Sequence, residues 1–84
     1  MSEREYTPHQ VMLLALHNSG AVIGRTGKTI DEIAELTGLP RDILLELVSI
    51  QVNSGYLEVS VDAENNKRYL LTGRGIIRVA SLYT

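Results

Sequence analysis

Two stretches of this sequence, Gly55-Tyr56-Leu57 and Tyr69-Leu70-Leu71-Thr72-Gly73-Arg74-Gly75, decide the fold that it predicts. Each marks a change of backbone state, because Gly55 can end a helix in the left-handed conformation and Thr72 can cap the start of another. Between them, Leu57, Val59 and Val61 alternate with polar residues, as one half-buried strand requires. Residues 62–66 are polar and tolerate turn geometry. The order expected here is therefore a helix, a hairpin and a final helix.

Further elements are expected on both sides of this hairpin. Thr7-Pro8-His9-Gln10 predicts a capping box that opens a first helix over residues 8–18. Residues 29–32 repeat the box and open a second helix over residues 30–36, and Pro40 opens a third over residues 40–54. Residues 21–23 suit a short strand added to the hairpin. A last helix over residues 73–83 carries an apolar stripe of Ile76, Ile77, Val79, Ala80 and Tyr83.

Composition predicts one domain, residues 1–84, built around an aliphatic core. The chain has 84 residues, of which 44% are hydrophobic, with four tyrosines as the only aromatic residues. There is no cysteine, which excludes disulfides and thiolate zinc sites. The charged start leads into no long apolar run, so we expect no signal peptide, no membrane span and a cytoplasmic protein.

Charge is divided unevenly along the chain, although the net charge is only −2. Residues 31–46 contain five acidic residues and a single base, Arg41. Residues 65–84 contain four basic residues, Lys67, Arg68, Arg74 and Arg78, and no acid. Either half can be a solvated surface, or the basic end can serve an anionic partner such as nucleic acid.

The ordered motifs resemble the winged helix-turn-helix domain of small bacterial and archaeal transcription regulators. Residues 29–40 are similar to the positioning helix and the turn, and Asn53-Ser54-Gly55-Tyr56-Leu57 to the end of the recognition helix and the entry to the wing. Residues 69–75 match the tyrosine, leucine, threonine and glycine pattern with which such wings return to the final helix. The resemblance implies an α+β fold with a three-helix core, a β-hairpin wing and a C-terminal helix. It also implies a DNA-binding transcription regulator.

Double-stranded DNA is therefore the first expected partner, with weak contacts that are mainly to phosphates. The candidate contacts are Arg25 and Lys28 in the loop before the second helix, Arg41, Ser49 and Asn53 on the third helix, and Lys67 and Arg68 on the wing. Asp42 and Glu46 share the polar stripe of the third helix with Ser49 and Asn53. Because carboxylates repel phosphates, this helix departs from an ordinary major-groove helix.

A protein-interaction module is the alternative, because the third helix has a wide apolar arc. Leu45 and Val52 lie at the edge of that arc, where a partner can cover them, although scattered apolar exposure is also normal. The same arc, together with the short chain, favours a homodimer formed through the terminal helices.

No catalytic, metal or cofactor site is expected. Gly24-Arg25-Thr26-Gly27-Lys28-Thr29 looks like part of a phosphate-binding loop, but Val22 stands where its first glycine belongs. His9 and His17 are eight residues apart on one helix, too far to share a metal. Asp31, Glu32 and Glu35 have no nucleophile beside them, so a solvated helix face explains them.

Overall fold

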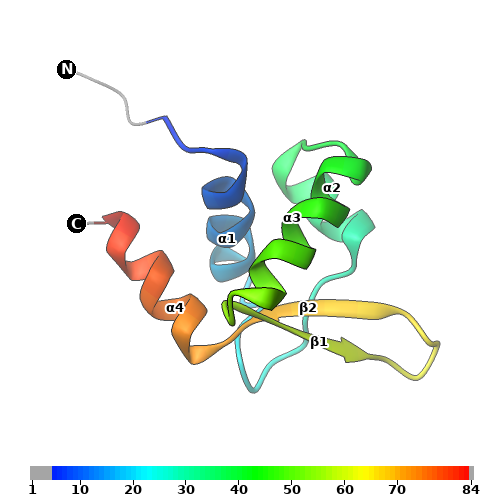
Figure 1. Ribbon diagram of the computed structural model, residues 1–84. Coiled ribbons are helices and arrows are strands. Elements are labelled where there is room, and N and C mark those ends of the chain that lie inside the picture. The colour runs from blue at the N-terminus through cyan, green and yellow to red at the C-terminus, as the bar shows by residue number, and fades with distance from the viewer. Residues whose placement is uncertain (1–4, 84) are drawn as a thin grey trace.

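The computed structural model describes residues 5–83 and has the expected order of three helices, a hairpin and a helix (Figure 1). The elements are α1 (Pro8–Asn18), α2 (Ile30–Thr37), α3 (Arg41–Asn53), β1 (Leu57–Val61), β2 (Lys67–Leu71) and α4 (Gly73–Ala80), with a 3₁₀ turn at Ser81–Tyr83. The helices pack together, and the hairpin extends from them to one side. This is the predicted α+β winged-helix architecture.

Capping boxes start α1 and α2, as predicted. The Thr7 backbone N–H donates to Gln10 Oε1 (2.9 Å), and the Gln10 N–H donates back to Thr7 Oγ1 (3.3 Å). The Thr29 and Glu32 pair makes the same two bonds at 2.9 and 3.2 Å. Each box satisfies two backbone N–H groups at the start of a helix that have no acceptor within the helix.

The third helix begins one residue later than predicted. Pro40 has an extended backbone (φ −63°, ψ 148°) and is the N-cap residue, so the prediction that it occupies the first helical position is wrong. Gly38 ends α2 in the left-handed conformation (φ 74°), and its N–H donates to the Ala34 carbonyl (2.8 Å). Gly55 (φ 82°) turns the chain after α3 into β1.

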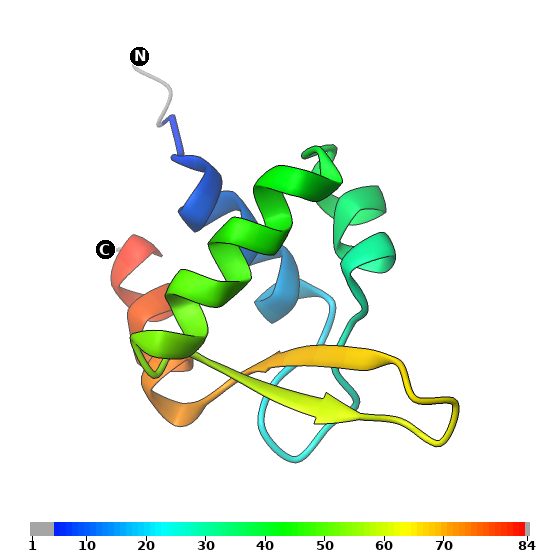
Figure 2. The same ribbon diagram turned by 45° about the vertical axis from the view of Figure 1, so that its right-hand side comes forward.

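The hairpin leaves the core soon after it begins. Its strands pair antiparallel from Leu57 with Leu71 to Val61 with Lys67. Leu57 is buried, but Val59 is exposed and Val61 is 58% exposed. The predicted half-buried face is therefore wrong beyond Leu57. The physical reason is the reach of the hairpin, whose far end projects past the helices (Figure 2).

The returning strand is more buried than its partner strand. Tyr69, Leu70 and Leu71 are all buried, so no alternation is visible at its end. The segment before α2 runs along its other edge, where Lys28 and Tyr69 exchange two backbone hydrogen bonds (2.8 and 2.9 Å). The strand predicted over residues 21–23 is only a single bridge, between Val22 and Leu71. It ends there because the chain turns at once, with the Arg25 N–H donating to the Val22 carbonyl (2.9 Å).

Thr72 starts α4 and joins it to the end of α3. Its Oγ1 accepts from the Gly75 N–H (3.0 Å), and its hydroxyl donates to the Gly55 carbonyl (2.6 Å). The helix ends at Ala80 and continues as the 3₁₀ turn to Tyr83, so the predicted single helix to residue 83 changes type in its last turn. Such tightening of a final turn is common.

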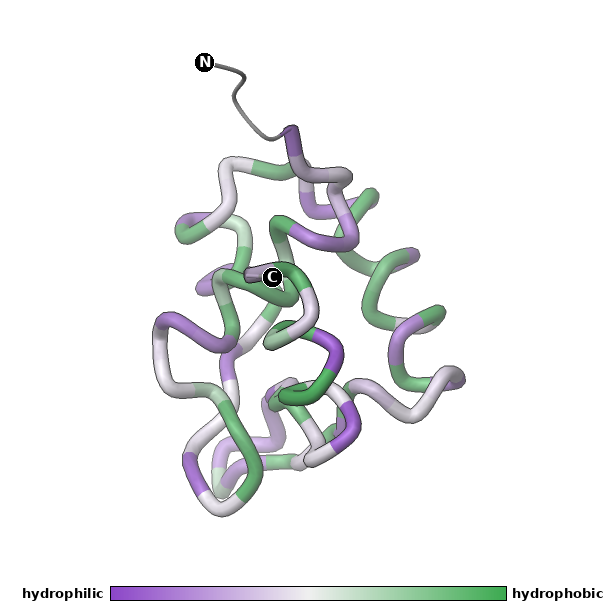
Figure 3. The backbone as a smooth tube through the Cα atoms, turned by 90° about the vertical axis from the view of Figure 1, so that its left-hand side faces the viewer, coloured by the Kyte–Doolittle hydropathy of each residue, from purple (hydrophilic) through white to green (hydrophobic). Residues whose placement is uncertain are grey.

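The predicted apolar stripe of α4 is only partly covered. Val79 is fully buried and Ile76 packs against the core, whereas Ile77 is 72% exposed and Tyr83 is also exposed. Figure 3 looks onto α4 and shows hydrophobic and hydrophilic residues alternating along it. Ile77 therefore leaves the stripe and meets solvent.

The core is aliphatic except for one tyrosine, as the composition predicts. It consists of Met12, Leu13, Leu16, Ala21, Ile30, Ile33, Leu44, Leu47, Val48, Leu57, Tyr69, Leu71 and Val79. Every helix and both strands contribute to this set, so the wing and α4 are anchored on the three-helix core. None of the helices in residues 5–83 is long and apolar enough to cross a bilayer.

Candidate nucleic-acid interface

The outer face of α3 lies open to solvent and crosses one side of the molecule (Figure 2). Leu44, Leu47, Val48 and Gln51 are its buried residues. Its exposed residues include six that bear on DNA binding: Arg41, Asp42, Leu45, Glu46, Ser49 and Asn53. The structure thus presents the whole polar stripe of the helix, including both carboxylates.

A groove runs between this face of α3 and the wing. A hollow of about 240 Å³ is lined by Leu45, Val48, Ser49, Val52, Asn53, Val59, Lys67 and Tyr69. A second, of about 270 Å³, extends toward the start of α2 and includes Thr29, Asp31, Arg41, Asn65 and Asn66. Leu45, Lys67 and Tyr69 line both hollows. The two hollows therefore adjoin, and together they are called the groove below, with Lys67 on its wing side.

Lys67 and Arg68 lie on opposite sides of the wing. Lys67 is exposed and lines the groove, whereas the Arg68 side chain reaches Glu32 and Gly27 on the other side. Neighbouring residues of a strand point to opposite faces, which separates the two cations. The carboxylates of Glu32 and Asp62 hold the Arg68 guanidinium in the protein, and the joint contact of both cations with the DNA backbone stays a prediction.

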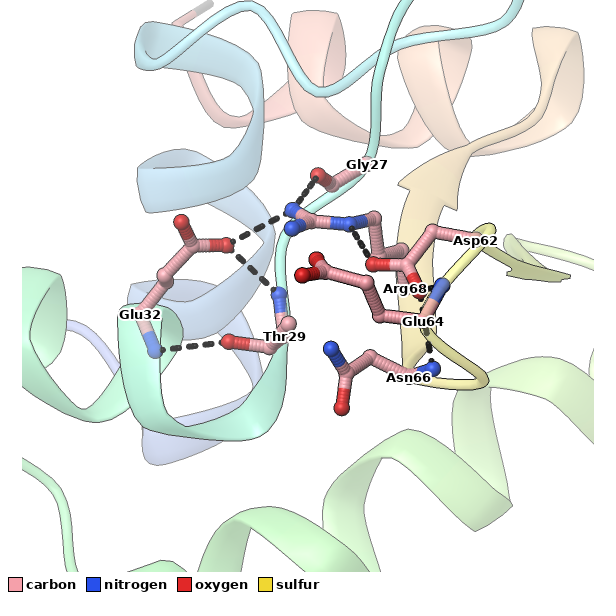
Figure 4. Close-up of polar contacts among 7 residues, drawn as sticks. All are labelled: Gly27, Thr29, Glu32, Asp62, Glu64, Asn66 and Arg68. Atoms are coloured by element: carbon pink, nitrogen blue, oxygen red, sulfur yellow. Dashed lines mark hydrogen bonds and ion pairs between the residues drawn. The ribbon is translucent and has the colours of Figure 1, made fainter.

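Arg68 joins the turn of the wing to the start of α2 (Figure 4). Its Nε donates to Asp62 Oδ2 (2.8 Å), and its Nη1 donates to Glu32 Oε1 (3.0 Å) and the Gly27 carbonyl (3.2 Å). The side chains of Arg68 and Asp62 are only 23% and 20% exposed. This set of contacts, from Arg68 to Asp62, Glu32 and Gly27, is called the wing clamp below.

Electrostatics of the wing clamp favour its charged state. The Thr29 N–H, and then the Arg68 and Lys28 charges, hold the pKa of Glu32 below its usual range. The Asn66 N–H, the hydrogen bond from Arg68 and the Glu64 N–H lower the pKa of Asp62. The hydrogen bond to Asp62 raises the pKa of Arg68. All three side chains are therefore ionised at neutral pH.

Arg41 lines the part of the groove near the start of α2 and forms an ion pair with Asp31. Both side chains are exposed, at 59% and 79%. An exposed pair of this kind contributes little and is easily exchanged for another partner. Arg41 therefore remains available to a phosphate at small cost.

Arg25 and Lys28, in the loop before α2, do not line the groove. Arg25 is exposed in the loop, and Lys28 lines a separate hollow of about 280 Å³ with Glu32, Glu35 and Leu36. This hollow shares no lining residue with the groove. The four cations predicted as contacts from the loop and the wing are thus divided between different parts of the surface.

The two apolar candidates differ in exposure. Leu45 is 47% exposed, whereas Val52 is half-buried and packs against the core. Ile43 and Ile50 are exposed on the same helix, and the sequence did not single them out as partner contacts.

Several contacts were not predicted from the sequence. The Arg74 guanidinium lies over the Tyr56 ring (5.3 Å to its centroid), a cation–π contact between α4 and the turn that follows α3. His9 Nδ1 lies 2.6 Å from Nε2 of the buried Gln51. Within residues 5–83, no three His, Asp or Glu side chains are grouped so as to hold a metal ion.

Comparison with known proteins places this geometry among winged-helix regulators. No family model and no curated protein matches the sequence. Among solved structures, a protein of Ralstonia eutropha JMP134 described as a candidate DNA-binding protein is 28% identical, with a TM-score of 0.76 over 95% of this chain and 100% of its own. The PcaV transcriptional regulator of Streptomyces coelicolor, solved with its natural ligand, is also 28% identical (TM-score 0.72, 93% of this chain).

A third structure, of Bordetella bronchiseptica BpsR, has a TM-score of 0.75 over 90% of this chain at 19% identity. Its DNA binding is regulated by 6-hydroxynicotinic acid. The chain spans about half the length of PcaV and BpsR, at 52% of each. The chain therefore has the winged helix-turn-helix fold of these DNA-binding regulators.

Proposed function

We propose that this winged-helix protein is a small transcription regulator that binds double-stranded DNA through α3 and the wing. The observation that carries the proposal is the groove, made of two adjoining hollows, between the exposed face of α3 and Lys67. The major groove of B-DNA is wide enough to admit a helix, and a cation on the wing then meets the adjacent backbone. The Ralstonia protein supports this role, because it is described as a candidate DNA-binding protein and matches over its full length.

Phosphate contacts supply most of the affinity in this proposal. Lys67 and Arg41 line the groove, and Arg25 and Lys28 add a second point of contact near the start of α2. Ser49 and Asn53 are the groups that reach base edges, since both are exposed on α3 and line the groove. Few cations face the DNA and two carboxylates oppose it, so binding is weak and strongly salt-dependent.

Lys67→Gln tests the phosphate contact from the wing. We expect the affinity to fall by a similar factor on duplexes of different sequence, because a phosphate contact carries no sequence information. The slope of log K against log salt should become shallower by about 0.9, the value for one released counterion. Fluorescence anisotropy with two unrelated duplexes measures both quantities.

Lys67→Arg is the matched control, since it keeps the charge and should keep the slope. If Lys67→Gln binds both duplexes with the parent affinity and slope, the wing is not part of the DNA interface.

Protein recognition is the second candidate function, favoured by the exposed apolar residues Ile43, Leu45 and Ile50 on α3. A partner with an apolar groove would cover them in place of DNA. In that case Leu45→Asp should abolish binding of the partner, while Lys67→Gln has no effect. The DNA proposal predicts instead that Lys67→Gln weakens binding to a duplex and makes that binding less dependent on salt.

A homodimer formed through the terminal helices belongs to the same proposal, because two copies bind the two half-sites of one DNA operator. Ile77 is 72% exposed on α4 and Tyr83 is exposed in the turn that follows. Sedimentation at micromolar concentration should give about twice the 9.3 kDa of one chain. Such a regulator acts in the cytoplasm and needs no catalytic residue or cofactor.

Ile77→Asp should weaken this dimer by at least about tenfold, since it buries a charge at the contact. Ile23→Asp is the matched control, because Ile23 is 55% exposed in the loop before α2. A parent protein that sediments only as a monomer would exclude the dimer at that concentration.

A further inference from the structure

We propose that Arg68 is a positioning residue that fixes the wing relative to α2 and so holds Lys67 beside the groove. Its role in DNA binding rests on the proposed function, whereas its effect on the wing does not. In this role the Arg68 guanidinium binds acceptors of the protein itself, in place of the DNA phosphate expected from the sequence. Its basis is that each described donor contact of Arg68 goes to a protein acceptor on the far side of the wing from the groove.

Both carboxylates of the wing clamp also accept hydrogen bonds from backbone N–H groups. Asp62 Oδ1 accepts from the Glu64 and Asn66 N–H groups, both at 2.9 Å, and this leaves Oδ2 for Arg68. Glu32 is fixed through its capping bond from the Thr29 N–H (2.9 Å). Ordering these carboxylates therefore adds little entropic cost to the clamp.

The wing needs such a contact because the core does not hold its far end. Val59 and Val61 are exposed on β1, and a two-stranded hairpin is at best marginally stable alone. Arg68 lies opposite Ser60, between those two valines in register. Its bonds to Glu32 and Gly27 tie this part of the hairpin to residues that precede and open α2.

The geometry requires arginine and not merely a positive charge. Nε contacts the wing turn while Nη1 contacts the start of α2, so two different nitrogens of one rigid plane serve the two sides. A lysine has a single nitrogen at the end of its chain and cannot reproduce this fork. Lysine does, however, serve a phosphate well as a point charge. Arg68→Lys therefore separates the two roles.

The first arm of the test needs no DNA. Amide hydrogen exchange is measured for the parent, Arg68→Gln and Arg68→Lys. We expect the Asp62 and Asn66 amides to exchange about fivefold faster in both variants, the size expected for a partly shielded ion pair. The amides in the middle of α1 should keep the parent rates and show that the core is intact. Unchanged exchange in the wing of Arg68→Gln would overturn the proposal.

The second arm compares binding to one nonspecific duplex over a range of salt. The wing clamp predicts that both variants lose affinity by a similar factor while the slope of log K against log salt stays that of the parent. A phosphate contact predicts instead that Arg68→Gln has a slope shallower by about 0.9 and that Arg68→Lys binds like the parent. That second pattern would overturn the proposal. If the parent does not bind DNA, the proposed function fails, and the exchange arm still decides the clamp.

Discussion

Replacing Gly75 by alanine should lower the free energy of unfolding by about 3 kcal/mol, at the upper end of the cost of overpacking. A Cβ at Gly75 would lie 2.1 Å from the Tyr56 carbonyl oxygen and 3.0 Å from Leu71 Cδ2. The first of these atoms belongs to the backbone, so a rotamer change cannot relieve the clash. The start of α4 would have to move away from the end of α3. Urea denaturation followed by circular dichroism measures the loss.

Gly73→Ala is the control for this prediction, because the two glycines lie in the same helical turn. A Cβ at Gly73 meets nothing within 4 Å. Alanine there should be neutral or stabilising by up to about 1 kcal/mol, since it restricts the unfolded chain and favours the helix. A Gly75→Ala protein as stable as Gly73→Ala would show that helix propensity, and not the close approach to Tyr56, governs this turn.

Glu46→Lys should tighten binding to a nonspecific duplex by about tenfold at low salt and steepen the salt dependence by about 0.9. Glu46 is exposed on the face of α3 that the proposal places against DNA. The change removes a carboxylate that phosphates repel and adds a cation that releases a counterion. Anisotropy titrations at several salt concentrations measure both effects.

Glu58→Lys carries the same change in net charge and serves as the control. Glu58 is exposed on β1 next to Val59, which lines the groove, so its side chain points to the opposite face of the strand. We expect it to change affinity much less than Glu46→Lys. Similar gains from the two variants would mean that overall charge, and not the α3 face, determines binding.

Local signals in the sequence predicted the fold well. Thr7 and Thr29 form the capping boxes expected of them, and Gly55 and Thr72 end and start helices where predicted. Each signal depends on residues within one turn of the chain, so a single sequence suffices to recognise it. The start of the third helix was predicted one residue too early, because proline suits both the N-cap position and the first helical position.

The burial of the hairpin could not be predicted in the same way. Alternation along β1 shows which side chains share a face, but it does not show how far the core extends beneath that face. Val59 and Val61 lie past the end of that support and are exposed. The close approach of Gly75 to Tyr56 was equally invisible, because glycine lowers helix propensity whether or not it permits a contact.

The elements that carry the candidate residues were predicted from the sequence, but the arrangement of the cations was not. Arg68 and Glu32 are 36 residues apart, and only the fold brings them together. Strand alternation does indicate that Lys67 and Arg68 face opposite sides, but it does not identify which of them meets a carboxylate. The exposed placement of Ser49 and Asn53, in contrast, follows directly from the helical period of α3.

The salt dependence of duplex binding by the unmodified protein tests the central claim most directly. With a labelled nonspecific duplex, the account predicts a dissociation constant of about 10 to 100 µM at low salt. It also predicts a slope of log K against log salt between about −2 and −4, with about 0.9 from each of Lys67, Arg41, Arg25 and Lys28 that contacts a phosphate. No detectable binding at low salt, or binding that is insensitive to salt, would contradict the assignment of α3 and the wing as a DNA-binding surface.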